Sequence, residues 1–204
     1  MRKKTLFLDP SKPIATCTQS SCEGCPLLDT LHCHFSGKDL AKFIAAVLPS
    51  FAIGGIGVYR LGVWFFIPWI LFILSYFELI EIRVMCSHCP HYAEAGKRLK
   101  CWANYGSPKL WRYRPGPMSW MEKAIFLAGL ILVFGYPLAL FLVAAKWSPA
   151  ALYGVAVVGA YLFMRKAMCS RCMNFACPLN LVDEARRKEF LKRNPPLLRV
   201  PPTA

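Results

Sequence analysis

The chain has 204 residues, of which 56% are hydrophobic and only 18% charged, and its formal net charge is +14. The high apolar content excludes an intrinsically disordered chain. Because the apolar residues come in long uninterrupted blocks, the positive charge is not interpreted as a nucleic-acid-binding surface, and we expect no nucleic-acid partner.

The N-terminal segment, residues 1–38, predicts a cytoplasmic metal-binding segment. Its four cysteines follow the pattern Cys17-x4-Cys22-x2-Cys25-x7-Cys33, and four thiolates within so short a stretch can close around one metal centre. The x4 and x2 spacing of the first three resembles the iron–sulfur loop of plant-type ferredoxins. The resemblance is to this spacing alone, because the fourth cysteine of that family lies much further along the chain.

Residues 39–85 are expected to form a first transmembrane hairpin, with spans over 43–59 and 61–82 joined at Arg60. A helix crosses a bilayer with roughly 17–25 apolar residues. Both blocks are apolar on every side, whereas a core helix of a soluble protein shows one apolar stripe. The capping-box spacing that begins at Ser36 marks the start of the first helix.

Two carboxylates lie near the end of the second span. Glu78 is a candidate intramembrane proton or ion site, because a carboxylate buried in a membrane is by default functional. We expect Glu81 to lie at the helix end, at the membrane interface, and to pair with Arg83. None of the four histidines falls within a span, which excludes a haem held by two histidines.

Residues 86–123 predict a cytoplasmic loop that combines a second cysteine group with an interfacial segment. The group is Cys86-x2-Cys89-Pro-His91, followed by Cys101. A Cys-x2-Cys turn directs two sulfurs to one point and suits zinc or an iron–sulfur cluster alike. The loop also mixes aromatic and basic residues that are expected in the lipid headgroup layer: Trp102, Tyr105, Lys109, Trp111, Arg112, Tyr113, Arg114 and Trp120.

Residues 124–166 are expected to form a second transmembrane hairpin, with spans over 124–145 and 149–164. Ser119 and Glu122 have the spacing of a capping box ahead of the first of these spans. The chain is therefore predicted to be an all-α integral membrane protein, with four transmembrane helices in two hairpins and cysteine-rich cytoplasmic loops.

The C-terminal segment, residues 167–204, holds the third cysteine group, Cys169-x2-Cys172-x4-Cys177. A charged stretch over 181–193 follows, with apolar residues at helical spacing. It predicts a short helix on the surface.

An internal repeat relates the second and third groups. Residues 83–92 align with 166–175, and Met-Cys-Ser-x-Cys is identical in the two copies. Two arrangements stay open. In the first, the copies join four sulfurs in one site: Cys86, Cys89, Cys169 and Cys172. In the second, each half holds its own cluster, with Cys101 or Cys177 as third ligand and His91 as a candidate fourth ligand in the first half.

The basic residues predict the orientation of the chain in the membrane. All but two of the 25 Lys and Arg lie on the side that holds both ends and the central loop, the exceptions being Arg60 and Lys146. The positive-inside rule places that side in the cytoplasm, in the cytoplasmic (inner) membrane, with some attraction to anionic lipid. All ten cysteines lie on the same side.

These features favour an integral membrane iron–sulfur protein that transfers electrons between a cytoplasmic or peripheral redox protein and the membrane. The ten cysteines would hold one to three clusters of the [4Fe–4S] type, or zinc. Cys25, Cys89 and Cys177 precede proline, as in bacterial ferredoxin loops.

The chain has no Walker loop and no dinucleotide glycine fingerprint. We therefore expect an electron-transfer subunit of an oxidoreductase system rather than a stand-alone enzyme, in an oligomer or a larger membrane complex. Two further classes stay open: a zinc-stabilised membrane scaffold or assembly factor, and a thiol-redox or metal-handling membrane protein.

Overall fold

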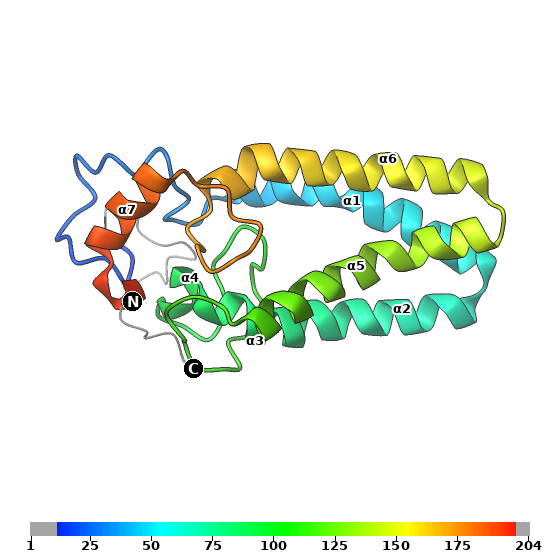
Figure 1. Cartoon of the computed structure of the whole chain (residues 1–204), viewed down its shortest axis with the longest axis horizontal. Coiled ribbons are helices and arrows are strands. Elements are labelled where there is room, and N and C mark those ends of the chain that lie inside the picture. Colours follow the sequence, from blue (N-terminus) through cyan, green and yellow to red (C-terminus); the bar gives the residue numbers. More distant parts are fainter. Residues whose placement is uncertain (1–11, 199–204) are drawn as a thin grey trace, which may run out of the picture.

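The computed structural model describes residues 12–198, and over that range it is all-helical apart from one isolated bridge between Arg98 and Pro108. Four helices are long and apolar enough to span a membrane, which indicates a membrane protein. They form an elongated bundle, and the cysteine-rich segments form a lobe at one end of it (Figure 1).

Each spanning helix has the following bounds. The first is α1 (Gly37–Leu61), and the second consists of α2 (Val63–Ser75), the π-helical turn η1 (Tyr76–Ile80), α3 (Glu81–Val84) and η2 (Cys86–His88). The third is α5 (Trp120–Val143), and the fourth is α6 (Trp147–Phe163), continued by the π-helical turn η3 (Met164–Met168) and η4 (Cys169–Arg171). Three short helices complete the described chain: α4 (Pro90–Ala93), α7 (Glu184–Arg193) and η5 (Pro195–Leu198).

Polar residues set the starts of two spanning helices, which both begin before the apolar blocks that predict them. Ser36 Oγ accepts a hydrogen bond from the Asp39 amide at 3.3 Å. Ser119 and Glu122 form a complete capping box, in which each side chain binds the backbone N–H of the other. The capping signals in the sequence are therefore confirmed at both positions.

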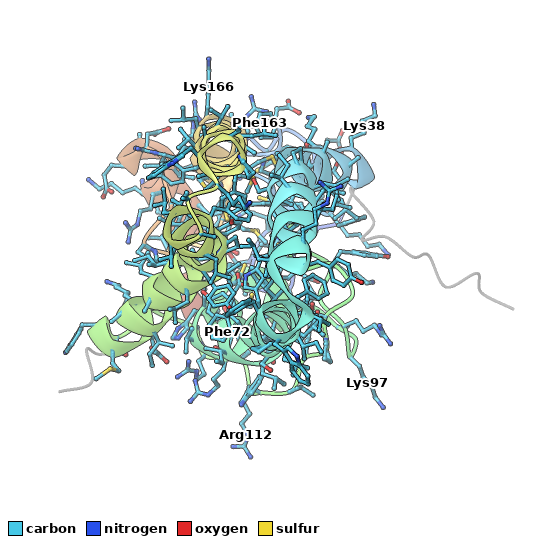
Figure 2. All side chains as sticks on the ribbon, turned by 90° about the vertical axis from the view of Figure 1, so that its right-hand side faces the viewer. Lys38, Phe72, Lys97, Arg112, Phe163 and Lys166 are labelled. Atoms are coloured by element: carbon cyan, nitrogen blue, oxygen red, sulfur yellow. The ribbon has the colours of Figure 1, made fainter. Side chains whose placement is uncertain are left out.

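The outer faces of the spanning helices are apolar and exposed. Trp64 is 82% exposed, Val143 88% and Val155 71%. Apolar surface this extensive is not stable against water, so these faces fit a lipid environment. Figure 2, which looks along the bundle, shows basic side chains such as Lys38 and Lys166 pointing outward from the periphery.

The two copies of the sequence repeat have the same local structure. In each, the spanning helix passes through a π-helical turn and ends in a 3-10 turn that contains the first cysteine. Ser87 Oγ donates to the carbonyl four residues earlier at 2.6 Å, and Ser170 Oγ does so at 2.7 Å. Met85 (φ −120°, ψ −54°) and Met168 (φ −114°, ψ −52°) share one backbone conformation. The repeat is therefore structural, and π-helical turns occur frequently at functional sites.

The aromatic residues of the central loop do not form one interfacial surface. Trp102 is buried, and its ring lies 6.3 Å from the His32 ring and 5.5 Å from the Phe43 ring, between centroids. Tyr105 and Trp120 are exposed. The expectation of a headgroup-layer segment is corrected for Trp102, which packs inside the lobe.

One carboxylate joins the lobe ends of the second and third spanning helices. Glu122 on α5 lies 3.6 Å from Arg83, 3.4 Å from His88 and 2.5 Å from Arg114. Arg114 also donates to the Arg83 carbonyl at 2.9 Å. The expected ion pair between Glu81 and Arg83 is therefore wrong, because Arg83 pairs with Glu122.

Replacing Glu122 by Gln should separate its charge from its role as a helix cap. Gln at this position keeps the capping box. We therefore expect the free energy of unfolding to fall by about 1–2 kcal/mol, because the charge-assisted hydrogen bonds of Glu122 are lost. The unfolding midpoint in mixed detergent micelles measures it. Glu184→Gln is the matched control, because its pair with Lys188 spans 3.8 Å between exposed side chains and such pairs contribute little. Equal losses of stability in the two variants would contradict a stabilising role for the Glu122 charge.

Candidate metal centres

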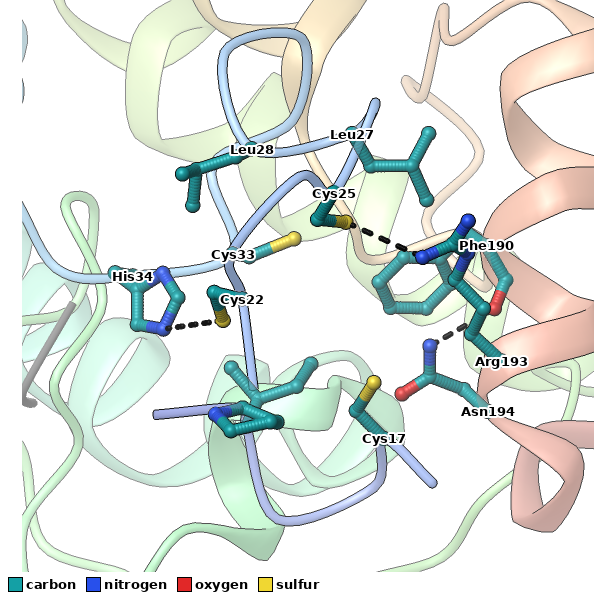
Figure 3. Close-up of a pocket in the computed structure, with 12 residues that line it drawn as sticks. Cys17, Cys22, Cys25, Leu27, Leu28, Cys33, His34, Phe190, Arg193 and Asn194 are labelled. Carbon is teal, nitrogen blue, oxygen red and sulfur yellow. Dashed lines mark hydrogen bonds between the residues drawn. The ribbon is translucent and has the colours of Figure 1, made fainter. Parts of the chain in front are cut away.

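The four cysteines of the N-terminal group line one pocket that is partly open to solvent. Tight turns shape the loop around it: the Cys17 amide donates to the Ile14 carbonyl at 2.9 Å, and the Cys25 amide to the Cys22 carbonyl at 3.1 Å. Figure 3 shows the sulfurs of the four cysteines facing the same space. The other residues that line the pocket are Pro13, Ile14, Leu27, Leu28, His34, Phe190, Arg193 and Asn194.

Burial controls the protonation of this group. Together with the neighbouring thiols of Cys25, Cys22 and Cys17, it raises the pKa of the Cys33 thiol to about 12. One negative charge is unfavourable here, and four would repel one another. A bound cation reverses this balance, because metals are held by the thiolate form.

The C-terminal helix α7 closes the other side of the pocket. Arg193 Nη1 donates to Cys25 Sγ at 3.6 Å, and the Arg193 carbonyl accepts from the Thr18 amide at 2.8 Å. Thr16 Oγ1 donates to Asn194 Oδ1 at 2.7 Å. The end of α7 is thus bound to the N-terminal loop, and a guanidinium lies beside the sulfurs.

The prediction of a surface helix over residues 181–193 is corrected in two respects. The helix begins at Glu184, with Asp183 as its N-cap, and Phe190 is buried against Phe175 with ring centroids 5.2 Å apart. Among the apolar positions used for the prediction, Leu181 is exposed. The helix is part of the first cysteine site.

The six other cysteines gather in one region at the lobe ends of the spanning helices: Cys86, Cys89, Cys101, Cys169, Cys172 and Cys177. Burial raises the pKa of Cys172 well above its usual value, and the nearby thiols of Cys89, Cys101 and Cys177 raise it further. Cys169 in turn lies near Cys177. The two copies of the repeat therefore share one region, and Cys101 and Cys177 belong to it together with the two Cys-x2-Cys turns.

Backbone N–H groups are directed at the sulfurs of this second group. Cys101 accepts from residues 102–104, Cys177 from residues 179 and 180, Cys89 from His91 and Cys172 from Asn174. Hydrogen bonds of this kind favour the thiolate, and in iron–sulfur proteins they tune the reduction potential.

Polar side chains flank the second group where it meets the bundle. Asn104 Nδ2 donates to Cys86 Sγ at 3.1 Å and to Glu81 Oε1 at 3.4 Å. Glu81 is only 6% exposed, and its Oε2 has no hydrogen-bond partner in the described residues. Glu78, the carboxylate singled out from the sequence, is exposed and accepts from Ser107 Oγ at 3.2 Å. Within the chain, Glu81 is therefore the more buried of the two carboxylates.

His91 lies between the two cysteine groups. It is 3% exposed, its Nδ1 has no hydrogen-bond partner in the described residues, and His32 and His34 of the N-terminal loop lie near it. Burial lowers the pKa of His91 to about 4, so the imidazole is neutral at physiological pH. In the N-terminal cysteine group, His34 Nε2 lies 3.9 Å from Cys22 Sγ.

All ten cysteines lie within the described residues, and none of them forms a disulfide. Within residues 12–198, no three His, Cys, Asp or Glu side chains lie close enough together to hold a metal ion. The thiols are gathered into two groups without converging on a common point, so metal binding would require the loops to draw inward.

Comparisons with known proteins do not assign the chain. No family model matches it, and neither a curated protein nor a solved structure matches it. The function is therefore argued from the residues of the chain itself.

Proposed function

We propose that this chain is an integral membrane iron–sulfur protein that transfers electrons between a cytoplasmic or peripheral redox protein and the membrane. The observation that supports this most is the gathering of ten cysteines, none in a disulfide, into two groups at one end of four helices long and apolar enough to span a membrane. Amide N–H groups directed at the sulfurs of the second group add to it.

Each group has its own set of proposed ligands. The N-terminal loop would hold one [4Fe–4S] cluster through Cys17, Cys22, Cys25 and Cys33. The region shared by the two repeats would hold one or two more through its six cysteines. Such clusters supply one-electron transfer. The chain supplies amide dipoles and the Arg193 guanidinium, which favour negative charge on the sulfurs, whereas burial disfavours that charge until a cation is bound.

The proposed orientation follows from charge. Almost all basic residues between 12 and 198 lie in the lobe or at the helix ends that adjoin it, and the positive-inside rule therefore favours a lobe in the cytoplasm and helices in the cytoplasmic (inner) membrane. The two pairs of helices would then cross as antiparallel hairpins. Electrons would enter or leave through the lobe.

Two rival functions use the same thiols. In a zinc-stabilised scaffold the metal would fasten together segments that are distant in sequence, such as the N-terminal loop and α7, which the Thr18–Arg193 hydrogen bond already joins. In a thiol-redox or metal-handling protein the Cys-x2-Cys pairs would cycle without a permanent metal.

Oxygen-free purification from membranes in detergent distinguishes the three functions. We expect a brown protein that absorbs near ~400 nm and contains roughly four or more iron atoms per chain, with matching acid-labile sulfide. Stoichiometric zinc without iron would replace the proposal with the scaffold. A metal-free preparation whose thiol count changes with redox state would replace it with thiol chemistry.

A further inference from the structure

The lobe-side ends of α1 and α6 lie next to each other. The two helices pack against one another, and the segments that adjoin them are joined by a hydrogen bond from the His32 amide to the Arg171 carbonyl at 2.8 Å. Residue 32 precedes α1, and residue 171 ends η4, which continues α6 and η3. The first turn of α1 and the π-helical turn η3 therefore share one edge of the bundle, where it meets the lobe (Figure 1).

Five exposed basic residues gather at this edge, which we name the basic edge: Lys38, Lys42, Arg165, Lys166 and Arg171. The only carboxylate in residues 37–42 and 164–171 is Asp39, which lies 3.0 Å from Lys42 and 3.2 Å from His32. In the described part of the chain, none of the other four basic residues forms an ion pair. Five positive charges and one negative charge leave +4 at this edge.

The same two helices present apolar surface directly beyond the basic edge. On α1, Ile44 is 47% and Leu48 57% exposed, and on α6 Leu162 is 56% exposed. Tyr161, itself 46% exposed, lies beneath Arg165, with 5.7 Å between the guanidinium carbon and the ring centroid. Exposed tyrosines are typical of the membrane interface. The basic edge therefore lies at the depth of the lipid headgroups.

We propose that the basic edge binds the phosphate headgroup of an anionic phospholipid whose acyl chains lie along α1 and α6. Unpaired cations at headgroup depth attract a lipid with net negative charge, whereas a zwitterionic lipid carries its own cation. A ligand with both a phosphate and long acyl chains matches the charges and the apolar faces together. A soluble phosphate or an acidic protein matches the charges alone. The proposal goes beyond the proposed function, because it needs no metal in the cysteine groups.

Native mass spectrometry of the full chain, released from detergent micelles, measures the affinity for single lipid molecules. Palmitoyl-oleoyl phosphatidylglycerol is the anionic probe, and phosphatidylcholine with the same acyl chains is the neutral probe. We expect the wild type to bind phosphatidylglycerol roughly tenfold more tightly than phosphatidylcholine. Added salt should weaken the binding of phosphatidylglycerol, because the basic side chains are exposed. Glycerol 1-phosphate, which carries the charge without the chains, should not displace the lipid.

Replacing Arg165 and Lys166 together by Gln should weaken the binding of phosphatidylglycerol roughly tenfold, because each basic residue near the membrane surface adds to the attraction. The affinity for phosphatidylcholine should stay unchanged. Exchanging the two residues, Arg165→Lys with Lys166→Arg, keeps both charges and should keep the wild-type affinity.

The matched control is Arg186→Gln with Lys188→Gln. It removes the same charge from exposed positions of α7, on the side of the lobe away from the bundle (Figure 1). Each of these residues already has a carboxylate partner: Arg186 lies 3.0 Å from Asp183, and Lys188 lies 3.8 Å from Glu184. The control should therefore bind phosphatidylglycerol as the wild type does.

Two outcomes overturn the proposal directly: equal affinities of the wild type for the two lipids, and equal losses in the two charge-removing variants, which would show that net charge alone matters. Displacement of the lipid by glycerol 1-phosphate would replace it with a site for soluble phosphate. Displacement by poly-glutamate at the same concentration of charge would replace it with a docking surface for an acidic protein. Iron analysis of the same preparations tests the proposed function separately.

Discussion

The Cys172→Ser variant should lose the metal of the second cysteine group and keep the metal of the first. A serine hydroxyl does not ionise at neutral pH, so it cannot replace a thiolate ligand. Cys172 has Cys89, Cys101 and Cys177 as neighbours, which makes it central to the second group. The first pocket is built from the N-terminal loop and α7 alone. Iron and sulfide per chain, together with the paramagnetic resonance spectrum, measure the outcome.

The reciprocal variant makes this prediction sharper. Cys33→Ser should remove the first signal and leave the second, because Cys33 is surrounded by Cys25, Cys22 and Cys17. Ser20→Ala, an exposed change in the same loop, should leave both signals intact. If either cysteine variant loses all of its metal while its circular dichroism matches the wild type, the two groups are a single cooperative unit and the assignment to separate centres is wrong.

The spanning helices could be predicted from the sequence because their signals are local. Apolar runs mark the spans, and the Ser36 and Ser119 caps act within one helical turn. The repeat was visible for the same reason: the identical Met-Cys-Ser-x-Cys segments begin the same 3-10 turn at the end of a spanning helix.

The contacts that complete the candidate sites were not predictable, because they join residues far apart in the chain. Arg193 reaches Cys25 across 168 positions, and no periodicity within α7 indicates that contact. The partner of Arg83 was misassigned for a related reason. Arg83 was expected to pair with its neighbour in sequence, whereas the fold brings Glu122 to it.

His91 illustrates the limit most clearly. Its spacing after Cys89 made it a candidate ligand, and the structure buries it near His32 of the N-terminal loop. The sequence places these residues on separate loops, on either side of the first pair of spanning helices. Only the return of both loops to one end of the bundle brings them together.

Replacing Gly129 by Ala should destabilise the bundle by about 3 kcal/mol, at the upper end of the range for overpacking. The ring of Tyr76 occupies the place where a Cβ on residue 129 would lie. The ring cannot move away freely, because its hydroxyl donates to the Phe126 carbonyl at 2.6 Å, one turn earlier on α5. The variant must therefore either separate α5 from η1 or leave a buried hydroxyl without a partner.

Gly159→Ala is the matched control for this prediction. It is also a helix-interior glycine in a spanning helix, but no heavy atom of the described chain outside its own helix backbone lies within 4 Å of its would-be Cβ. We expect it to be neutral or slightly stabilising, since Ala favours a helix over Gly by up to about 1 kcal/mol. Unfolding midpoints in mixed micelles compare the two. The Tyr76→Leu substitution, which removes the ring, should make a further Gly129→Ala change almost harmless. If the two losses simply add, the close approach of Tyr76 to Gly129 does not control the packing of α5.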